Sequence, residues 1–313
     1  MPPSLPLLDP TRPAKTSVAV SDGRTVAGRA APGGAGAPGG VATAGAAGGV
    51  ATELTGTLLG RLRSPGSVRP PVDHSLAGGL RAWLEDGVVA VAAHGGPALV
   101  VRPGQDGGLT ATADEATRLS GRALRTTLLR TVFRITVTSG PPRAAFEDAL
   151  AALAVDEEGD TVAEAVRRLP RHRRAQLREL VRHAASGITA QWGPPPASWL
   201  PRTGERLAAP LAGGRVVLRS DADLAMGGPS AGRASVCAVR AHGGAVRDDG
   251  PNRRLLALLE TLRSGAAPFR VASYDLDRAR LTVEDVTDGL LSAAVHDVLA
   301  LVDAHTRVRA GGR

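Results

Sequence analysis

Apolar and polar positions follow a strand-like pattern most clearly in the second half of the chain. Short runs rich in β-branched or other apolar residues predict strands at 205–211, 215–218, 234–239, 269–274 and 281–283. The Gly213–Gly214 pair between the first two runs predicts a hairpin. Leucines at helical spacing from Leu255 to Leu262 predict an amphipathic helix before the fourth run. This order indicates an α/β fold with a central mixed β-sheet flanked by helices.

The part of the chain before the sheet shows helical periodicity instead. Helices are expected at 75–85, 114–139, 143–153, 161–169 and 173–185, and a closing helix at 284–302. The runs at 88–93 and 98–101 alternate with glycine-containing turns and predict a hairpin. Trp192 and Trp199 are expected to pack against the sheet, because the chain has few other aromatic residues for its core.

Composition divides the 313 residues into regions. Residues 1–50 are mostly Gly, Ala, Pro, Ser and Thr, which bury too little apolar surface to offset chain entropy, so a disordered N-terminal tail is predicted. The expected divisions are the tail at 1–50, a mostly helical N-terminal part at 51–190, the α/β core at 191–306 and a basic tail at 307–313.

The location of the protein is predicted from what the sequence lacks. The chain has neither an apolar run of membrane-spanning length nor a secretory signal, which predicts a cytoplasmic protein without a membrane partner. Its one cysteine, Cys237, lies in an apolar run and is expected to be a core residue, consistent with a reducing compartment.

Basic residues outnumber acidic ones and give a formal charge of +8. Lys15 is the only lysine, so the remaining positive charge belongs to arginine, whose rigid fork suits phosphate. DNA is therefore a favoured partner, although a GC-rich genome also replaces lysine by arginine without selection for binding. The densest basic cluster is predicted to contact nucleic acid, with a solvated helix face as the alternative, and consists of Arg167, Arg168, Arg171, Arg173 and Arg174.

Two carboxylates, Asp221 and Asp223, follow the second strand run and are spaced to share one face if the strand continues through them. The next strand carries the triplet Ala238–Arg240, and the following helix carries Asn252 and Leu256. This order of acid, hairpin, strand, helix and strand resembles the core of the PD-(D/E)XK nucleases, in particular the RecB-like branch and its actinobacterial members. In that family an aspartate binds metal, an acid–spacer–lysine triplet lies on the next strand, and Gln and Tyr lie on the helix.

The resemblance implies an altered hydrolytic site. The family uses Mg²⁺, which takes carboxylate oxygens, to hydrolyse phosphodiester bonds. Asp223 is implied as the catalytic metal ligand, with Asp221 and Glu205 as further candidate metal ligands and Arg240 in the position of the catalytic lysine. Because Ala238 lacks a carboxylate, Mg²⁺ binding is expected to be weak or absent. Arginine also cannot act as a proton shuttle in the place of the lysine.

Three classes of function stay open. The leading hypothesis is a nuclease-fold protein of DNA repair or processing, which binds DNA, or a partner nuclease or helicase, with its hydrolytic activity weakened or lost. Asn252, in place of the family's Gln, joins the nucleic-acid contacts, and His242 is a further candidate ligand or base. The alternatives are an active, divergent Mg²⁺-dependent DNase and a non-enzymatic structural or partner-binding module. Walker, Rossmann, nucleophile-elbow and zinc-helix motifs are absent from the sequence.

Overall fold

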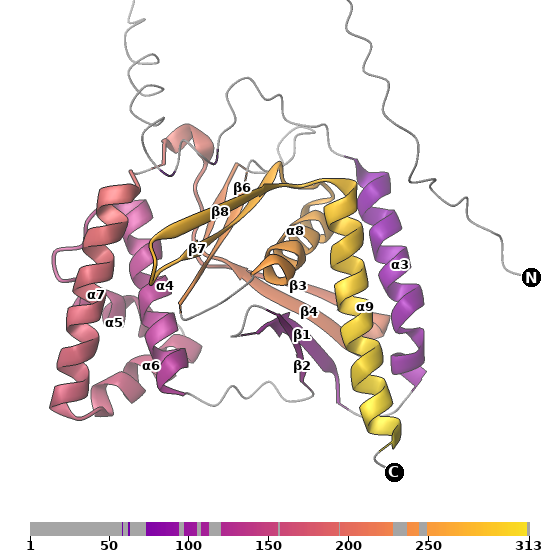
Figure 1. The fold of residues 1–313 in the computed structure, drawn as a ribbon, viewed down its shortest axis with the longest axis horizontal. Coiled ribbons are helices and arrows are strands. Elements are labelled where there is room, and N and C mark those ends of the chain that lie inside the picture. The colour runs from indigo at the N-terminus through magenta and orange to yellow at the C-terminus, as the bar shows by residue number, and fades with distance from the viewer. Residues whose placement is uncertain are drawn as a thin grey trace, which may run out of the picture. The chain divides into compact units, whose positions relative to one another are not determined.

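Helix α8 (Gly250–Ser264) packs against strands of two four-stranded sheets in the computed structural model (Figure 1). The structure describes Leu58, Leu62 and residues 73–93, 97–104, 108–112, 120–155, 157–193, 195–227, 237–243 and 249–311. The tail predicted at 1–50 and the turn predicted at His94 lie outside these residues. All the described residues belong to one compact unit, Gly45–Arg313.

The first sheet has the strand order β2-β1-β4-β3. Strand β1 (Leu99–Pro103) runs parallel to β4 (Val216–Ala222), while β2 (Leu109–Thr112) pairs with β1, and β3 (Glu205–Leu211) with β4, in the antiparallel sense. The turn between β3 and β4 places both of its glycines at positive φ, 63° and 87°, where a side chain would be strained. The hairpin predicted at this Gly-Gly pair is confirmed.

The second sheet has the order β5-β6-β7-β8. Strands β6 (Cys237–His242) and β7 (Arg270–Asp275) are parallel and are joined by α8 as the crossover helix. Strands β5 (Leu224–Met226) and β8 (Arg280–Asp285) close the two edges in the antiparallel sense. The order of strand, helix and strand predicted here is confirmed, although positions 234–236 of the predicted strand lie outside the described residues.

The prediction of one central sheet is wrong, although the mixed α/β class is confirmed. Only Asp223 separates β4 from β5, so a single path of chain bends there and passes from one sheet to the other. The backbone N–H of Asp223 donates to the carbonyl oxygen of Val239 at 2.9 Å, which ties the bend to β6. The sequence has continuous extended character through this bend, and for that reason its pattern predicts one sheet.

Helices α4 (Gly121–Ser139), α5 (Ala145–Leu153), α6 (Glu157–Arg168) and α7 (Arg171–Gln191) pack together on one side of the second sheet (Figure 1). The four helices predicted here are confirmed, with the first described from Gly121 rather than from 114. The Ser120 hydroxyl caps α4 by accepting from the N–H of Ala123 at 3.1 Å. The rings of Phe133, Trp192 and Tyr274 contact one another in the core, which confirms the packing role of Trp192.

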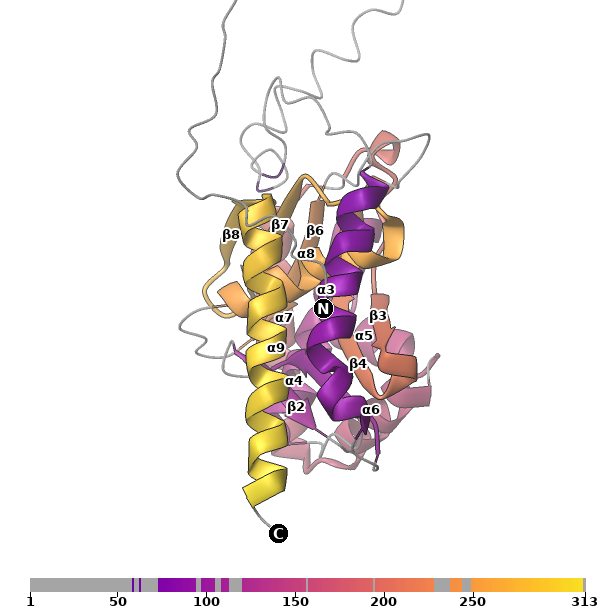
Figure 2. The same ribbon diagram turned by 90° about the vertical axis from the view of Figure 1, so that its right-hand side faces the viewer.

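Helices α3 (His74–Ala93) and α9 (Asp288–Gly311) lie side by side (Figure 2). The strand predicted at 88–93 is wrong, because Leu80, Leu84 and Val88 recur every four residues and are at most 5% exposed on one helical face. A Cβ at Gly87 would lie 2.5 Å from a methyl carbon of Leu299, so glycine permits this close packing. Helix α9 also takes in residues 307–311, where a basic tail was expected.

The structure bears on the predictions for Cys237 and for membrane-spanning helices. Cys237 is fully buried, which confirms its place in the core, and burial raises the pKa of its thiol to about 12. Among the helices of the described residues, none is both long and apolar enough to cross a membrane.

Candidate functional site

The bend at Asp223 brings together the residues that the sequence singles out. Leu224 pairs with Val239 across the antiparallel strands β5 and β6, and this register places Asp223 beside Arg240. The two residues are 17 positions apart in sequence but adjacent in the sheet, as the predicted site requires.

Two arginines and a backbone amide donate hydrogen bonds to the carboxylate of Asp223, a residue with no exposed surface. Arg130 donates through Nε to both carboxylate oxygens, at 3.0 and 2.9 Å, and Arg134 donates through Nε to Oδ1 at 2.7 Å. The backbone N–H of Ala241 donates to Oδ2 at 2.8 Å. Both oxygens of the predicted metal ligand are therefore already hydrogen-bonded.

Asp221 shares the same guanidinium from a more open position. Its Oδ2 lies 3.0 Å from Nη1 of Arg130, and its side chain is 40% exposed. Burial raises the pKa of the Asp221 carboxyl, but the charges of nearby arginines, Arg130 first among them, outweigh this and hold the pKa below its usual value. Asp221, Asp223, Arg130 and Arg134 are called the Asp223 cluster below.

Sequence patterns contain no direct signal that Arg130 and Arg134 belong to this site. The two arginines are one helical turn apart on α4, beside its apolar face, and α4 contains no acidic residue to pair with them. Arginines at the margin of a buried face without a partner on their own helix imply a partner elsewhere. This feature could have raised the question of a distant partner, although it could not have named Asp223.

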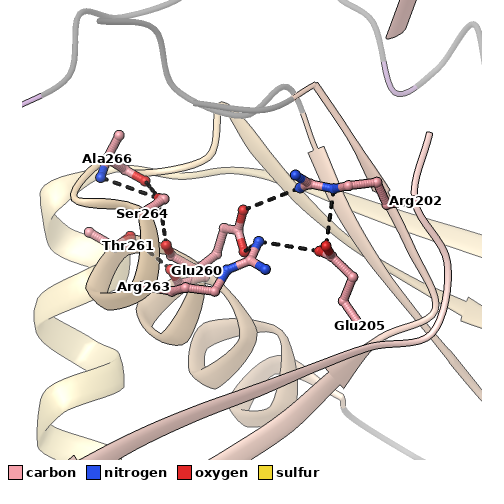
Figure 3. Close-up of polar contacts among 8 residues, drawn as sticks. Arg202, Glu205, Glu260, Thr261, Arg263, Ser264 and Ala266 are labelled. Carbon is pink, nitrogen blue, oxygen red and sulfur yellow. Dashed lines mark hydrogen bonds and ion pairs between the residues drawn. The ribbon is translucent and has the colours of Figure 1, made fainter. Parts of the chain in front are cut away.

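Glu205, predicted as a metal ligand, is instead part of a separate ion-pair cluster (Figure 3). It contacts Arg202 at 3.1 Å and Arg263 at 3.2 Å, and Arg263 also contacts Glu260 at 2.7 Å. The assignment of Glu205 to the metal site is therefore corrected: the residue faces these arginines at the start of β3 and not the bend. Glu205, Glu260, Arg202 and Arg263 are called the Glu260 cluster below.

These residues do not fit an Mg²⁺ site. The Asp223 carboxylate is held by donors, Glu205 lies in another cluster, and Ala238, on β6 with 1% exposure, offers no oxygen ligand from its side chain. Within the described parts of the chain there is no group of three or more His, Cys, Asp or Glu residues arranged to hold a metal ion.

Arg240, in the position of the family's lysine, is 13% exposed in its side chain. Burial and the charge of Arg130 lower the pKa of Arg240. Its Nη1 atom lies 3.9 Å from Oδ1 of Asp249, and its Nε atom is buried without a hydrogen-bond partner. The side chain is therefore neither solvated nor fully paired.

Asn252 does not occupy a position from which it can contact nucleic acid. The residue is 1% exposed, and its side-chain amide donates to Oδ1 of Asp249 at 2.6 Å. This corrects the prediction for Asn252, which supports the residue at the start of α8 instead. Leu256, one turn further on, is fully buried in the core.

A cavity of about 140 Å³ lies next to Arg240, where β1 and β6 end and where α4 and α8 begin. His242 lines it, is 8% exposed, and has a buried Nδ1 atom without a partner. Burial lowers the pKa of His242, and this outweighs the opposing effect of Asp249 and Asp275. The remaining lining residues are Pro103, Gly104, Arg122, Ala123, Thr126, Thr127, Arg240, Gly243 and Asp249.

The predicted nucleic-acid contacts on α6 and α7 fall into two groups. Arg167 and Arg168 lie within ion-pair distance of Glu164 on their own helix, Arg168 at 2.7 Å. Arg171 and Arg173 are exposed in the first turn of α7, and Arg174 is half-buried there. That turn contains no acidic residue, and Pro170 before it makes no side-chain cap.

No protein-family model, curated protein or solved structure matches this chain. What the structure defines is a mixed α/β protein in which a buried aspartate at a strand bend is held by two arginines, beside a small cavity bordered by Arg240 and His242.

Proposed function

We propose that this protein is a hydrolytically silent relative of the RecB-like PD-(D/E)XK nucleases that binds DNA. The observation that carries the proposal is the contact of Asp223 with Arg130 and Arg134, opposite Arg240 on the neighbouring strand. By the resemblance, Asp223 corresponds to the family's metal ligand and Arg240 to its lysine, but cations of the chain itself hold the acid.

The loss of hydrolysis is argued from the groups that the reaction needs. A metal ion would have to polarise the phosphate and activate water, and the oxygens available to it at Asp223 are hydrogen-bonded to Arg130, Arg134 and the amide of Ala241. Arg240 keeps the positive charge of the lysine but does not exchange a proton near neutral pH. Binding of phosphate is retained in this scheme, and cleavage is not.

DNA binding is supported by where the basic residues lie. The segment Pro141–Arg143, just after α4, lines one surface hollow with the last part of α7, from Arg182 to Ala190. The two helices therefore run in the same direction and begin at the same end (Figure 1). Arg122 of α4 and the basic first turn of α7 lie at that end, and the cavity beside Arg240 opens between the start of α4 and the strand ends.

The placement of the α7 arginines favours an external anion. Positive side chains at a helix N-terminus oppose the helix dipole, so they lower rather than raise the stability of the helix. Arg171, Arg173 and Arg174 all occupy that first turn. A phosphate backbone would meet both their charges and the unpaired N–H groups of the helix end.

The test is binding of labelled DNA, measured by fluorescence anisotropy over a range of salt, together with plasmid nicking in Mg²⁺ and in Mn²⁺. We expect salt-sensitive binding without cleavage. Replacing Arg171, Arg173 and Arg174 by Gln is expected to reduce the slope of log K against log salt by about 2–3, near 0.9 for each phosphate that is no longer neutralised. Replacing Arg167 and Arg168, which are paired on α6, is the matched control and has a smaller effect.

Two outcomes would replace this proposal with the alternatives. Metal-dependent nicking that disappears in Asp223→Ala would identify an active DNase. Absence of DNA binding at low salt would leave a structural or partner-binding module.

A further inference from the structure

We infer that the cavity beside Arg240 is a binding site for a pyrimidine base, supplied either by a free nucleoside or by an unpaired base of a DNA strand. Only the second source rests on the proposed function. Two observations carry the inference: polar side chains of the cavity have hydrogen-bonding capacity that the described chain does not use, and the space between them has the size of one ring.

Three side chains that line the cavity are buried and incompletely paired. Oδ1 of Asp249 accepts from Asn252 at 2.6 Å, but its Oδ2 has no hydrogen-bond partner, and neither has Nε of Arg240 or Nδ1 of His242. The guanidinium and the carboxylate are neighbours, with Nη1 of Arg240 3.9 Å from Oδ1 of Asp249. Because a carboxylate only accepts and a guanidinium only donates, a ligand that satisfies both carries a donor beside an acceptor.

The mixed charge of the lining argues against a simple ion inside the cavity. Asp249 repels a phosphate, and Arg240 together with Arg122 repels a metal cation, because both signs of charge line one small space. His242 adds no charge at neutral pH, since burial lowers its pKa, and its ring nitrogens donate or accept according to the tautomer. A neutral ligand with polar edges is compatible with all of these groups.

The volume of the cavity selects a single ring. It is about 140 Å³, and a cavity of about 150 Å³ holds benzene, whereas a purine has a second ring. The edge of a pyrimidine carries a donor beside an acceptor: N3–H beside O4 in thymine, and the N4 amino group beside N3 in cytosine. Pro103 and Ala123 add apolar surface to the lining, which suits the faces of such a ring.

The rim of the cavity suits the part of a nucleotide that lies outside it. Arg122 lines the cavity but is exposed, and it belongs to the first turn of α4. A base bound inside would direct its sugar toward this rim, where the guanidinium can contact the attached phosphate. Nucleosides, which have no phosphate, therefore test the cavity separately from this contact.

The experiment measures binding of thymidine and deoxycytidine to the full chain by titration calorimetry and by the NMR shifts of its histidine rings. We expect a Kd on the order of 0.1–1 mM for both, as suits ligands of this size, and binding of deoxyadenosine that is weaker by about tenfold or more. Asp249→Asn keeps an oxygen for Asn252 but replaces the unpaired acceptor by an amide donor, and should weaken binding of the pyrimidines by about tenfold or more. Asp277→Asn is the matched control, because Asp277 lies near Gly243 without lining the cavity, and it should bind as the wild type does.

Gly243→Ala is a second variant, which decides the question if Asp249→Asn does not fold. A Cβ at this position would lie 3.4 Å from Oγ1 of Thr126, so the change fits the fold but narrows the cavity, and binding should weaken several-fold. Melting temperatures identify the folded variants. The inference is overturned if the folded wild type binds neither pyrimidine nucleoside, if it binds the purine equally well, or if the folded variants at Asp249 and Gly243 bind as the wild type does.

Oligonucleotides then distinguish the two sources of the base. If the natural ligand is an unpaired base of DNA, the wild type should bind oligothymidine more tightly than an abasic strand of the same length in anisotropy measurements, and Asp249→Asn should lose this difference. Nucleoside binding without such a difference assigns the cavity to the free nucleoside. Because nucleosides carry no phosphate, their binding does not depend on DNA binding, so the inference and the proposed function fail separately.

Discussion

The Asp223 cluster and the Glu260 cluster have the same composition: each holds two carboxylates and two guanidinium groups. In the Glu260 cluster, two of the contacts join residues three apart, Arg202 with Glu205 and Glu260 with Arg263. In the Asp223 cluster, Arg130 and Arg134 are 93 and 89 positions away from the aspartate. The first cluster joins a helix to the start of a strand, whereas the second fastens a helix to the bend between two sheets.

The difference shows where a functional interpretation is justified. Both clusters contain buried polar atoms without hydrogen-bond partners: Nε and Nη2 of Arg202 in the Glu260 cluster, and Nη2 of Arg130 in the Asp223 cluster. The two clusters differ in what lies beside them. Only the Asp223 cluster adjoins the cavity, where further buried atoms of Arg240, His242 and Asp249 also lack partners. Because unpaired buried polar groups lower stability, this cavity is the place where a ligand would compensate for them.

The largest expected effect comes from breaking the Asp223 cluster at its centre. Asp223→Ala leaves Arg130 without its main partner in a buried position, and we expect it to lower the free energy of unfolding by about 3–5 kcal/mol. Urea unfolding followed by circular dichroism measures this change. Asp221→Ala, at the exposed side of the same cluster, is the control and should cost about 1 kcal/mol or less.

The corresponding change in the Glu260 cluster should be smaller. Glu260→Gln removes the charge of a fully buried carboxylate, but its partner Arg263 is 34% exposed and can reach water. We expect a loss of about 1–3 kcal/mol in the same urea experiment. A loss as large as that of Asp223→Ala would remove the energetic distinction between the two clusters.

A pH titration separates the clusters through His242, which borders only the Asp223 side. Its folded-state pKa is lowered by burial, with Arg240 and Arg253 adding to the effect and Asp249 and Asp275 opposing it. The unfolded chain therefore binds a proton first, so stability falls as the pH drops below about 6.5, by at most about 1.4 kcal/mol per pH unit from this group. His242→Asn should flatten the curve between about pH 7 and 5, and an unchanged curve would show that His242 is not the group responsible.

The smallest effect on stability is expected for the first turn of α7. Replacing Arg171, Arg173 and Arg174 by Gln removes charges that oppose the helix dipole, so the melting temperature should stay within about 2 °C of the wild type or rise slightly. The same variant is expected to lose most of the salt dependence of its DNA binding. A drop in stability instead would assign these arginines to the fold, as the Glu260 cluster is assigned.

Sequence patterns predicted the elements that depend on local spacing. The leucines of α8, the Gly-Gly hairpin and the helices α4 to α7 follow from periodicities of two and 3.6 residues. The strand expected at 88–93 failed because the run GVVAVAA is rich in valine, but its first valine, Val88, is buried and continues the helical face of Leu80 and Leu84. Helix α3 packs against α9, and a helix so distant in sequence is not visible in a local window.

The candidate site was predictable only in part. The spacing of Asp221 and Asp223 and the order of elements led to the strand ends at which Asp223 and Arg240 lie together. Which side chains hold Asp223 was not predictable, because Arg130 and Arg134 belong to a helix far away in sequence. Glu205 was misassigned for the same reason, because its partner Arg263 lies 58 positions away. The partner of Asn252, Asp249, lies only three residues before it, and in that case the sequence did not show that the side chain is buried.

The bend at Asp223 couples the opening of the two sheets. Its backbone N–H donates to the carbonyl oxygen of Val239, and its carboxylate accepts from the backbone N–H of Ala241, so both the backbone and the side chain of the residue are bonded to β6. Deuterium can replace these two amide hydrogens only when the bend separates from β6. Their exchange should therefore be among the slowest in the molecule and should report the joint opening of both sheets.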